Sequence, residues 1–286
     1  MNIEKYMVTG NKKINLADFD TKDTGGFDSS EDTENIVSKN IELISDYQNR
    51  FYAEGKTGLL IIFQAMDAAG KDSAIKHVMT GVNPQGVDVY SFKKPSAEEL
   101  AHDYMWRAGK VLPERGKIAI FNRSYYEDVL IVKVHKLYES YNLPDRYKTE
   151  DIIDKRYKQI RHFEDYLQEN GIVVLKFFLH LSKDTQRKRF LERIDIKDKN
   201  WKFSEADIEE REYWDDYQKA YETAINATAS AENPWYIVPA DRKWFTRVVI
   251  SKVLLETMKK IDPQYPVISP EHEAELERCR QLLGEK

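Results

Sequence analysis

Short apolar runs alternate with amphipathic segments along most of the chain. Continuous apolar runs bounded by turn residues are typical of strands buried on both faces of a parallel sheet. Five segments have this character: 59–63, 87–92, 117–121, 172–181 and 235–238. Because predicted helices separate these segments, we expect a three-layer α/β fold with one five-stranded parallel sheet and helices on both faces.

The segments between the strands have apolar residues at helical spacing. Predicted helices cover 35–54, 96–110, 150–169, 184–193, 205–228 and 244–261. Ser96 and Glu99 are spaced as a capping box at the start of one of them. We expect one domain over 35–265, a polar N-terminal arm over 1–34 and a C-terminal tail over 266–286. Ligands of such a sheet bind at the carboxyl ends of the strands.

The segment 64–73 follows the first strand directly and leads into a helix. This is the context of a Walker A phosphate loop (P-loop), in which backbone N–H groups and the helix N-terminus surround a phosphate. Gly70 and Lys71 occupy the last glycine and the lysine of the motif. We expect phosphate to bind at Ala68, Ala69, Gly70, Asp72 and Ser73, and Lys71 to be catalytic. The alternative is a tight turn with a surface lysine.

Two positions of this loop differ from the usual motif. Ala65 stands where the first glycine normally lies, and Asp72 replaces the Ser or Thr that binds magnesium. The carboxylate of Asp67 within the loop offers a hard oxygen ligand for Mg²⁺. Asp67 is therefore a predicted metal ligand and catalytic residue.

Polar residues also follow the third strand, in the segment 121–129. The end of a neighbouring strand faces the phosphate loop in this kind of sheet, so these side chains can hold magnesium or phosphate. Arg123 can serve as a fork for phosphate oxygens, and Glu127 or Asp128 as metal or acceptor-orienting groups. The alternative is an N-capped helix whose acids favour its positive end.

A basic segment after the fourth strand supplies an anion site in an acidic protein. The net charge of the chain is −5, which argues against a nucleic-acid partner. Residues 183–202 nevertheless contain eight basic and four acidic residues. We predict a helical lid at about 183–215, in which Arg187, Arg193 and Arg211 bind a polyanion. The alternative is a solvated helix face.

The acceptor side is predicted on the segment that follows the second strand. Lys94 can meet a phosphate there, and Tyr104 or Trp106 can pack on a base. The alternative is aromatic core packing with surface charge. We expect Trp201, like most other tryptophans of the chain, to lie in the core.

Several segments together resemble the family-2 polyphosphate kinases: 64–73, 81–84, 103–107, 121–129, 175–180 and 201–203. The resemblance extends over residues 30–265. It implies a P-loop kinase-like fold with a helical lid, and phosphoryl transfer between polyphosphate and adenine nucleotides. It also implies dependence on Mg²⁺, for which Mn²⁺ could substitute, and a homo-oligomer.

The departures from the family pattern point to one subgroup. Many members have an aspartate at the position of Asn122, and Asn-Arg at the positions of Glu127 and Asp128. At these positions the chain resembles the class III enzymes, which accept AMP as well as ADP. The resemblance implies that Asp67, Gly70 and Lys71 hold polyphosphate and metal, and that Arg123 contacts phosphate. With the position of Asp128 after the third strand, we predict a metal site of Asp67, Asn122 and Asp128, substrate contacts from Asn122 and Glu127, and a catalytic role for Asp128.

Composition limits the remaining function classes. No apolar run is long enough to span a membrane, residues 1–13 lack the long apolar stretch of a secretory signal, and the single cysteine excludes an internal disulfide. We therefore expect a cytoplasmic protein without a membrane partner. Two rivals stay open: an ATP-dependent kinase of nucleoside monophosphates or small metabolites, and a non-catalytic polyanion-binding module on a decayed P-loop.

Overall fold

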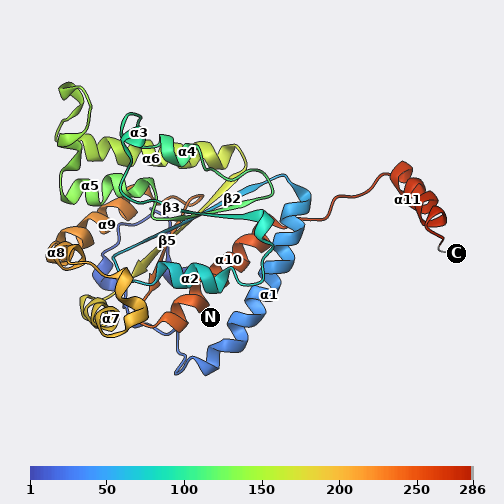
Figure 1. The fold of residues 1–286 in the computed structure, drawn as a ribbon, viewed down its shortest axis with the longest axis horizontal. Helices are drawn as coiled ribbons and strands as arrows, with labels where there is room; N and C mark the ends of the chain where they lie inside the picture. Colours follow the sequence, from blue (N-terminus) through green and yellow to red (C-terminus); the bar gives the residue numbers. More distant parts are fainter. Residues whose placement is uncertain (285–286) are drawn as a thin grey trace.

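The computed structural model describes residues 1–284, and a six-stranded sheet forms its centre (Figure 1). The strand order is β1-β6-β5-β2-β4-β3. The strands are β1 (Met7–Val8), β2 (Gly58–Ala65), β3 (Val87–Ser91), β4 (Ile118–Asn122), β5 (Ile172–His180) and β6 (Trp235–Pro239). The five predicted strands are parallel, as expected. The strand count was wrong, because two residues of the N-terminal arm add β1 antiparallel to β6.

Helices cover both faces of the sheet, which confirms the three-layer α/β fold (Figure 1). One apolar cluster packs α1, α2 and α10 against the sheet, and the other packs α6 and α9 against the opposite face. The helix bounds are α1 (Glu31–Glu54), α2 (Lys71–Val78), α3 (Ala97–Leu100), α4 (Trp106–Gly109), α5 (Ile131–Val134), α6 (Ile152–Glu169), α7 (Lys183–Asp195), α8 (Ala206–Glu212), α9 (Trp214–Thr228), α10 (Lys243–Ile261) and α11 (Pro270–Leu282).

Two predicted helices are interrupted. The helix expected over 96–110 is divided into α3 and α4, because the Asp103 side chain accepts a hydrogen bond from the Met105 N–H and forms a turn between them. Its predicted capping box of Ser96 and Glu99 is present. The helix expected over 205–228 is divided at Tyr213 into α8 and α9.

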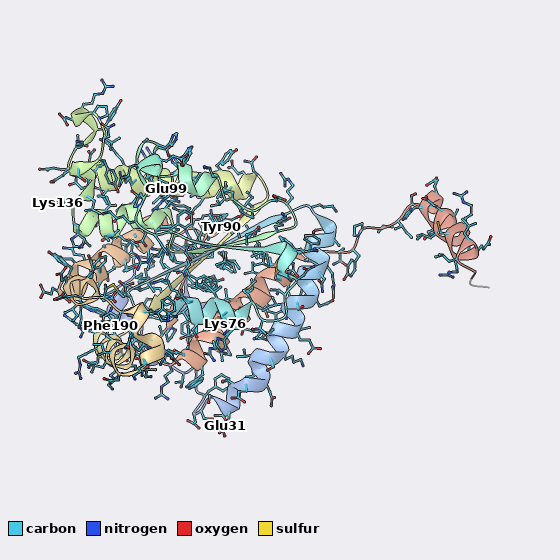
Figure 2. The ribbon with its side chains drawn as sticks, viewed as in Figure 1. Glu31, Lys76, Tyr90, Glu99, Lys136 and Phe190 are labelled. Atoms are coloured by element: carbon cyan, nitrogen blue, oxygen red, sulfur yellow. The ribbon has the colours of Figure 1, made fainter. Side chains whose placement is uncertain are left out.

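The predicted lid segment (183–215) comprises α7, the 3-10 helix η7 (Lys197–Lys202), α8 and the start of α9. Phe190 of α7, labelled in Figure 2, is buried and packs edge-on against Phe203, which ties α7 to the residues after η7. Met7 and Val8 of the arm pair with β6, whereas α11 projects away from the body at the end of the tail (Figure 1). Among residues 1–284, no helix has the length and apolar character needed to cross a bilayer.

A buried ion pair joins the middle of β5 to α6. Lys176 of β5 and Glu164 of α6 are 0% and 1% exposed and bond to each other. Tyr125 and Tyr126 both donate hydroxyl hydrogen bonds to Glu164, and Lys176 also donates to the Thr228 carbonyl. Because the two tyrosines belong to the segment that follows β4, this cluster fixes that segment to the core.

Candidate functional site

The phosphate loop leaves the end of β2 and enters α2, as the sequence predicts. Ala68 and Gly70 have φ values of 61° and 101°, and Gly70 is the N-cap of α2. Lys71 is only 9% exposed, and its Nζ donates to the Ala65 carbonyl at 3.0 Å. Burial, assisted by the charge of Arg123, lowers the Lys71 pKa to about 8. The loop therefore ends in a buried lysine that is the first residue of α2.

This loop forms the floor of an open cavity of about 720 Å³, the phosphate-loop cavity. The cavity brings together most of the predicted phosphate-binding positions. They are the loop residues 67–73, Lys94, Asn122, Arg123 and Arg193. Further cationic side chains complete its wall: Lys93, Arg189, Lys199, Lys202 and Lys243. The result is a basic depression in a protein of net negative charge.

Arg123 and Asp67 form an ion pair in the wall of this cavity. The Arg123 Nη2 atom lies 2.6 Å from the Asp67 Oδ1 atom. Glu127 lies nearby, fixed by a hydrogen bond from the Gln64 side chain. Its charge, with that of Asp67, raises the pKa of Arg123, so the guanidinium stays protonated. Arg123 is therefore a permanent cation beside the phosphate loop.

Oxygen atoms available to a metal line the same cavity. Asn122 donates a hydrogen bond to Asp72 at 2.7 Å, and the Asp67 carboxylate keeps one oxygen outside the pair with Arg123. Within residues 1–284, no group of three His, Cys, Asp or Glu residues converges on one point. Mg²⁺ in phosphoryl-transfer enzymes uses one or two carboxylates together with substrate phosphates and water. Asp67, Asp72 and Asn122 fit that requirement.

The arginines predicted in the lid segment occupy different positions. Arg193 lines the cavity and donates to the Lys202 carbonyl at 3.0 Å. Arg211 donates to the Lys183 carbonyl and to the Gln186 side chain, so it braces α7 against α8. Arg187 is exposed on α7 and is not among the described residues that line the cavity. The core prediction for Trp201 is wrong, because its side chain is 78% exposed at the cavity rim.

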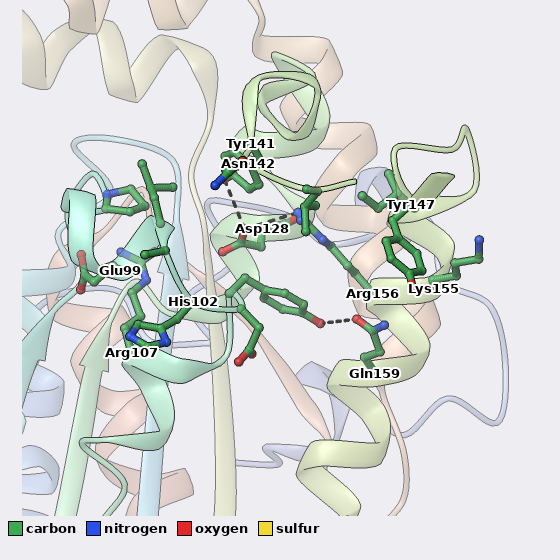
Figure 3. Close-up of a pocket in the computed structure, with 17 residues that line it drawn as sticks. Glu99, His102, Arg107, Asp128, Tyr141, Asn142, Tyr147, Lys155, Arg156 and Gln159 are labelled. Carbon is green, nitrogen blue, oxygen red and sulfur yellow. Dashed lines mark hydrogen bonds and ion pairs between the residues drawn. The ribbon is translucent and has the colours of Figure 1, made fainter. Parts of the chain in front are cut away.

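A second cavity of about 420 Å³, the aromatic cavity, lies under α3 and beside α6 (Figure 3). Asp128 is 4% exposed at its base, where the Arg156 Nη1 atom donates to the Asp128 backbone carbonyl at 2.9 Å. Arg156 and Tyr141 also approach the Asp128 carboxylate, both at 3.4 Å. Burial raises the pKa of Asp128 to about 6. The structure therefore does not place Asp128 beside the other two predicted metal ligands, Asp67 and Asn122.

Tyr104 lines the aromatic cavity, and its hydroxyl donates to the Gln159 side chain at 3.0 Å. Trp106 instead stacks on His102, with ring centroids 3.9 Å apart. Lys94 faces the phosphate-loop cavity, and the neighbouring residue Pro95 lines the aromatic one. The segment 93–95 thus forms part of both walls and connects the two cavities.

Comparison with known proteins shows the family to which this chain belongs. The family model described as Polyphosphate kinase 2 (PPK2) matches residues 26–266. The chain belongs to the polyphosphate kinase 2 family. A crystal structure of polyphosphate kinase 2 from Arthrobacter aurescens superposes with a TM-score of 0.86 at 35% identity, and the match covers 96% of this chain and 95% of that one.

Two relatives of this polyphosphate kinase 2 family member match over nearly their whole length. The ADP-polyphosphate phosphotransferase of Rhodopseudomonas palustris is 49% identical, over 98% of each chain. The AMP/ADP-polyphosphate phosphotransferase of Meiothermus ruber is 42% identical, over 92% of this chain and 96% of that protein.

Sequence reasoning missed several residues of the aromatic cavity in this family member. Arg156 and Gln159 lie on α6, and Tyr141 lies in the loop before it. Neither segment carries a recognisable local motif, because the amphipathic pattern of α6 only predicts a helix. The contact between the buried residues Arg156 and Asp128, which are 28 positions apart in the sequence, forms only in the tertiary fold.

Proposed function

We propose that the protein transfers phosphoryl groups from inorganic polyphosphate to AMP and ADP, forming ADP and ATP in a reversible, Mg²⁺-dependent reaction. The supporting observation is the pairing of two unlike cavities. One is open and basic and lies on a phosphate loop, and the other is aromatic and lies beside it. The names of the two full-length relatives agree with this division between polyphosphate and adenine nucleotide.

Polyphosphate is the donor that suits the phosphate-loop cavity. Lysine and arginine side chains line its wall from five separate segments: the loop, the segments after β3 and β4, the lid segment and α10. Such a surface attracts a flexible polyanion by charge and does not depend on one ligand shape. Trp201 at the rim is the only aromatic side chain of the lid segment that lines the cavity in the described residues.

The aromatic cavity suits the acceptor nucleotide. Tyr104 and Tyr141 offer ring faces for a base, while Arg107 and Lys155 offer cations for its phosphate. The ionised carboxylate of Asp128 can accept a hydrogen bond from an exocyclic amine of adenine. This role fits its buried position in the aromatic cavity better than a metal-ligand role.

Transfer then proceeds in line between the two cavities. Lys71 and Arg123 neutralise the charge of the moving phosphoryl group, and Asp67 orients Arg123 through their ion pair. Bound Mg²⁺ would be held by Asp67 and Asn122 or Asp72 together with substrate phosphates, and it would supply further charge neutralisation. Cationic residues of the lid segment, with Arg193 foremost, cover the donor and exclude water.

The experiment that tests this proposal compares donors. Purified protein is given AMP or ADP with Mg²⁺ and either long-chain polyphosphate or ATP as the sole donor, and K71M serves as the control variant. We expect rapid transfer from polyphosphate, almost none with K71M, and loss of turnover when EDTA removes the metal. Transfer from ATP alone, with polyphosphate inert, would establish the rival ATP-dependent kinase instead.

A further inference from the structure

One arginine of the lid segment holds backbone carbonyls of the phosphate loop. Arg189 of α7 is 7% exposed, and its Nη1 atom donates to the carbonyls of Ala68 and Ala69, each at 2.9 Å. Its Nη2 atom donates to the carbonyls of Ala240 and Asp241 at 2.7 and 3.2 Å. Within residues 1–284 it forms no ion pair with a carboxylate. The guanidinium therefore joins two backbone segments through four carbonyl acceptors.

These contacts fix the direction in which the loop presents its N–H groups. The C=O and N–H of one peptide unit point in opposite directions. Because the Ala69 carbonyl is held by Arg189, the N–H of Gly70 faces the other way, and no described residue accepts a hydrogen bond from it. Ala68 has a φ of 61°, a conformation that costs a non-glycine residue energy unless its surroundings hold it. The Arg189 bond to the Ala68 carbonyl supplies such a restraint.

The second pair of carbonyls belongs to a loop that is itself well anchored. The Asp241 carboxylate accepts from the backbone N–H and the hydroxyl of Ser182, at 2.8 and 2.7 Å. Ser182 is the N-cap of α7, the helix that carries Arg189. Thr21 of the N-terminal arm donates its hydroxyl to the same carboxylate at 3.0 Å. The loop after β6 therefore fixes both the start of α7 and the end of the Arg189 side chain.

We propose that Arg189 is a positioning residue that sets the phosphate loop for transfer by holding its carbonyls, while the other lid cations grip polyphosphate directly. The inference rests on the proposed function. It assigns different roles to Arg189 and Arg193, which lie one helical turn apart on α7. Arg193 is the matched comparison, because it lines the same cavity and holds only one carbonyl, that of Lys202, beside an ion pair with Asp207 at 3.9 Å.

The test compares R189K, R189M and R193M in steady-state kinetics with polyphosphate at several salt concentrations. Losing one preorganised N–H donor typically lowers kcat by about 100-fold, and we expect R189M to lose about that much. The salt dependence of its KM should remain that of the wild type, because both Nη atoms of Arg189 donate to backbone carbonyls and not to phosphate. R189K should not restore kcat, since an ammonium cannot span two pairs of carbonyls. R193M should instead raise KM and flatten its salt dependence.

A second readout does not depend on turnover. Backbone amide exchange at residues 66–72 should accelerate in R189M and R189K but not in R193M, while the midpoint of unfolding shows whether each variant is folded. If R189M does not fold, R189K carries both measurements. The proposal is wrong if R189K keeps wild-type kcat, or if R189M flattens the salt dependence as R193M does. Inactivity of the wild type with polyphosphate would contradict the proposed function, whereas the exchange data would still test whether Arg189 holds the phosphate loop.

Discussion

The catalytic lysine should give the enzyme an alkaline limit. Lys71 is 9% exposed and bonds to the Ala65 carbonyl, and burial together with Arg123 lowers its pKa from 10.5 to about 8. Only the protonated ammonium can neutralise phosphate. As the pH rises through about 8, the free enzyme loses this proton. The kcat/KM for polyphosphate should therefore fall on the alkaline side.

The size of the effect follows from one titrating group. Between pH 7 and pH 9 the protonated fraction of Lys71 should fall about tenfold, and kcat/KM with it. The profile of kcat should break at higher pH, because bound phosphate favours the charged form of the lysine. Because loss of structure would lower kcat and kcat/KM at the same pH, a higher alkaline pKa in the kcat profile than in the kcat/KM profile indicates titration of Lys71.

The assay is the initial rate of ATP formation from ADP at subsaturating polyphosphate, from pH 6 to pH 10 at constant ionic strength. K71R is the control, because a guanidinium stays protonated throughout this range. It should be less active than wild type and should lack the alkaline limb. A flat wild-type profile up to pH 10, or a K71R profile with the same limb, would refute the reasoning.

Two further predictions concern buried charges. Because burial raises the pKa of Asp128 to about 6, kcat/KM for AMP should fall as the pH decreases through about 6. The AMP phosphate titrates in the same range, so D128N, which should lack the Asp128 contribution, must be measured beside the wild type. K176M should lower the free energy of unfolding by about 3–5 kcal/mol in urea titrations, because it leaves Glu164 buried and unpaired. K176M/E164Q should recover part of that loss, and equal stability of K176M and wild type would contradict the account.

Contiguous features of the sequence predicted the fold and the floor of the site. The apolar run of β2, the phosphate loop and the start of α2 follow one another directly, so one continuous segment determines the geometry of the phosphate loop. Asn122 and Arg123 were predictable because parallel strands end at the same edge, which brings the end of β4 beside the loop. Each of these inferences needs only local pattern and strand direction.

Features that depend on tertiary packing were not predictable in the same way. The strand β1 has two residues and leaves no periodic signal in the arm. The exposure of Trp201 depends on where the lid segment lies, whereas the residue type alone predicts burial, because tryptophan side chains are highly buried on average. Asp128 was grouped with the metal ligands by its position after β4, yet the 3-10 helix η4 (Tyr125–Val129) turns it toward Arg156.

The central claim is tested most directly by product analysis from AMP alone. The purified protein is mixed with long-chain polyphosphate, Mg²⁺ and AMP, with ADP alone in a parallel reaction, and nucleotides are separated over time by anion-exchange chromatography. The account predicts that ADP forms from AMP first and ATP follows, and that ADP alone yields ATP. Phosphorylation of ADP but not AMP would contradict the proposed acceptor range. Phosphorylation of neither nucleotide would contradict the central claim.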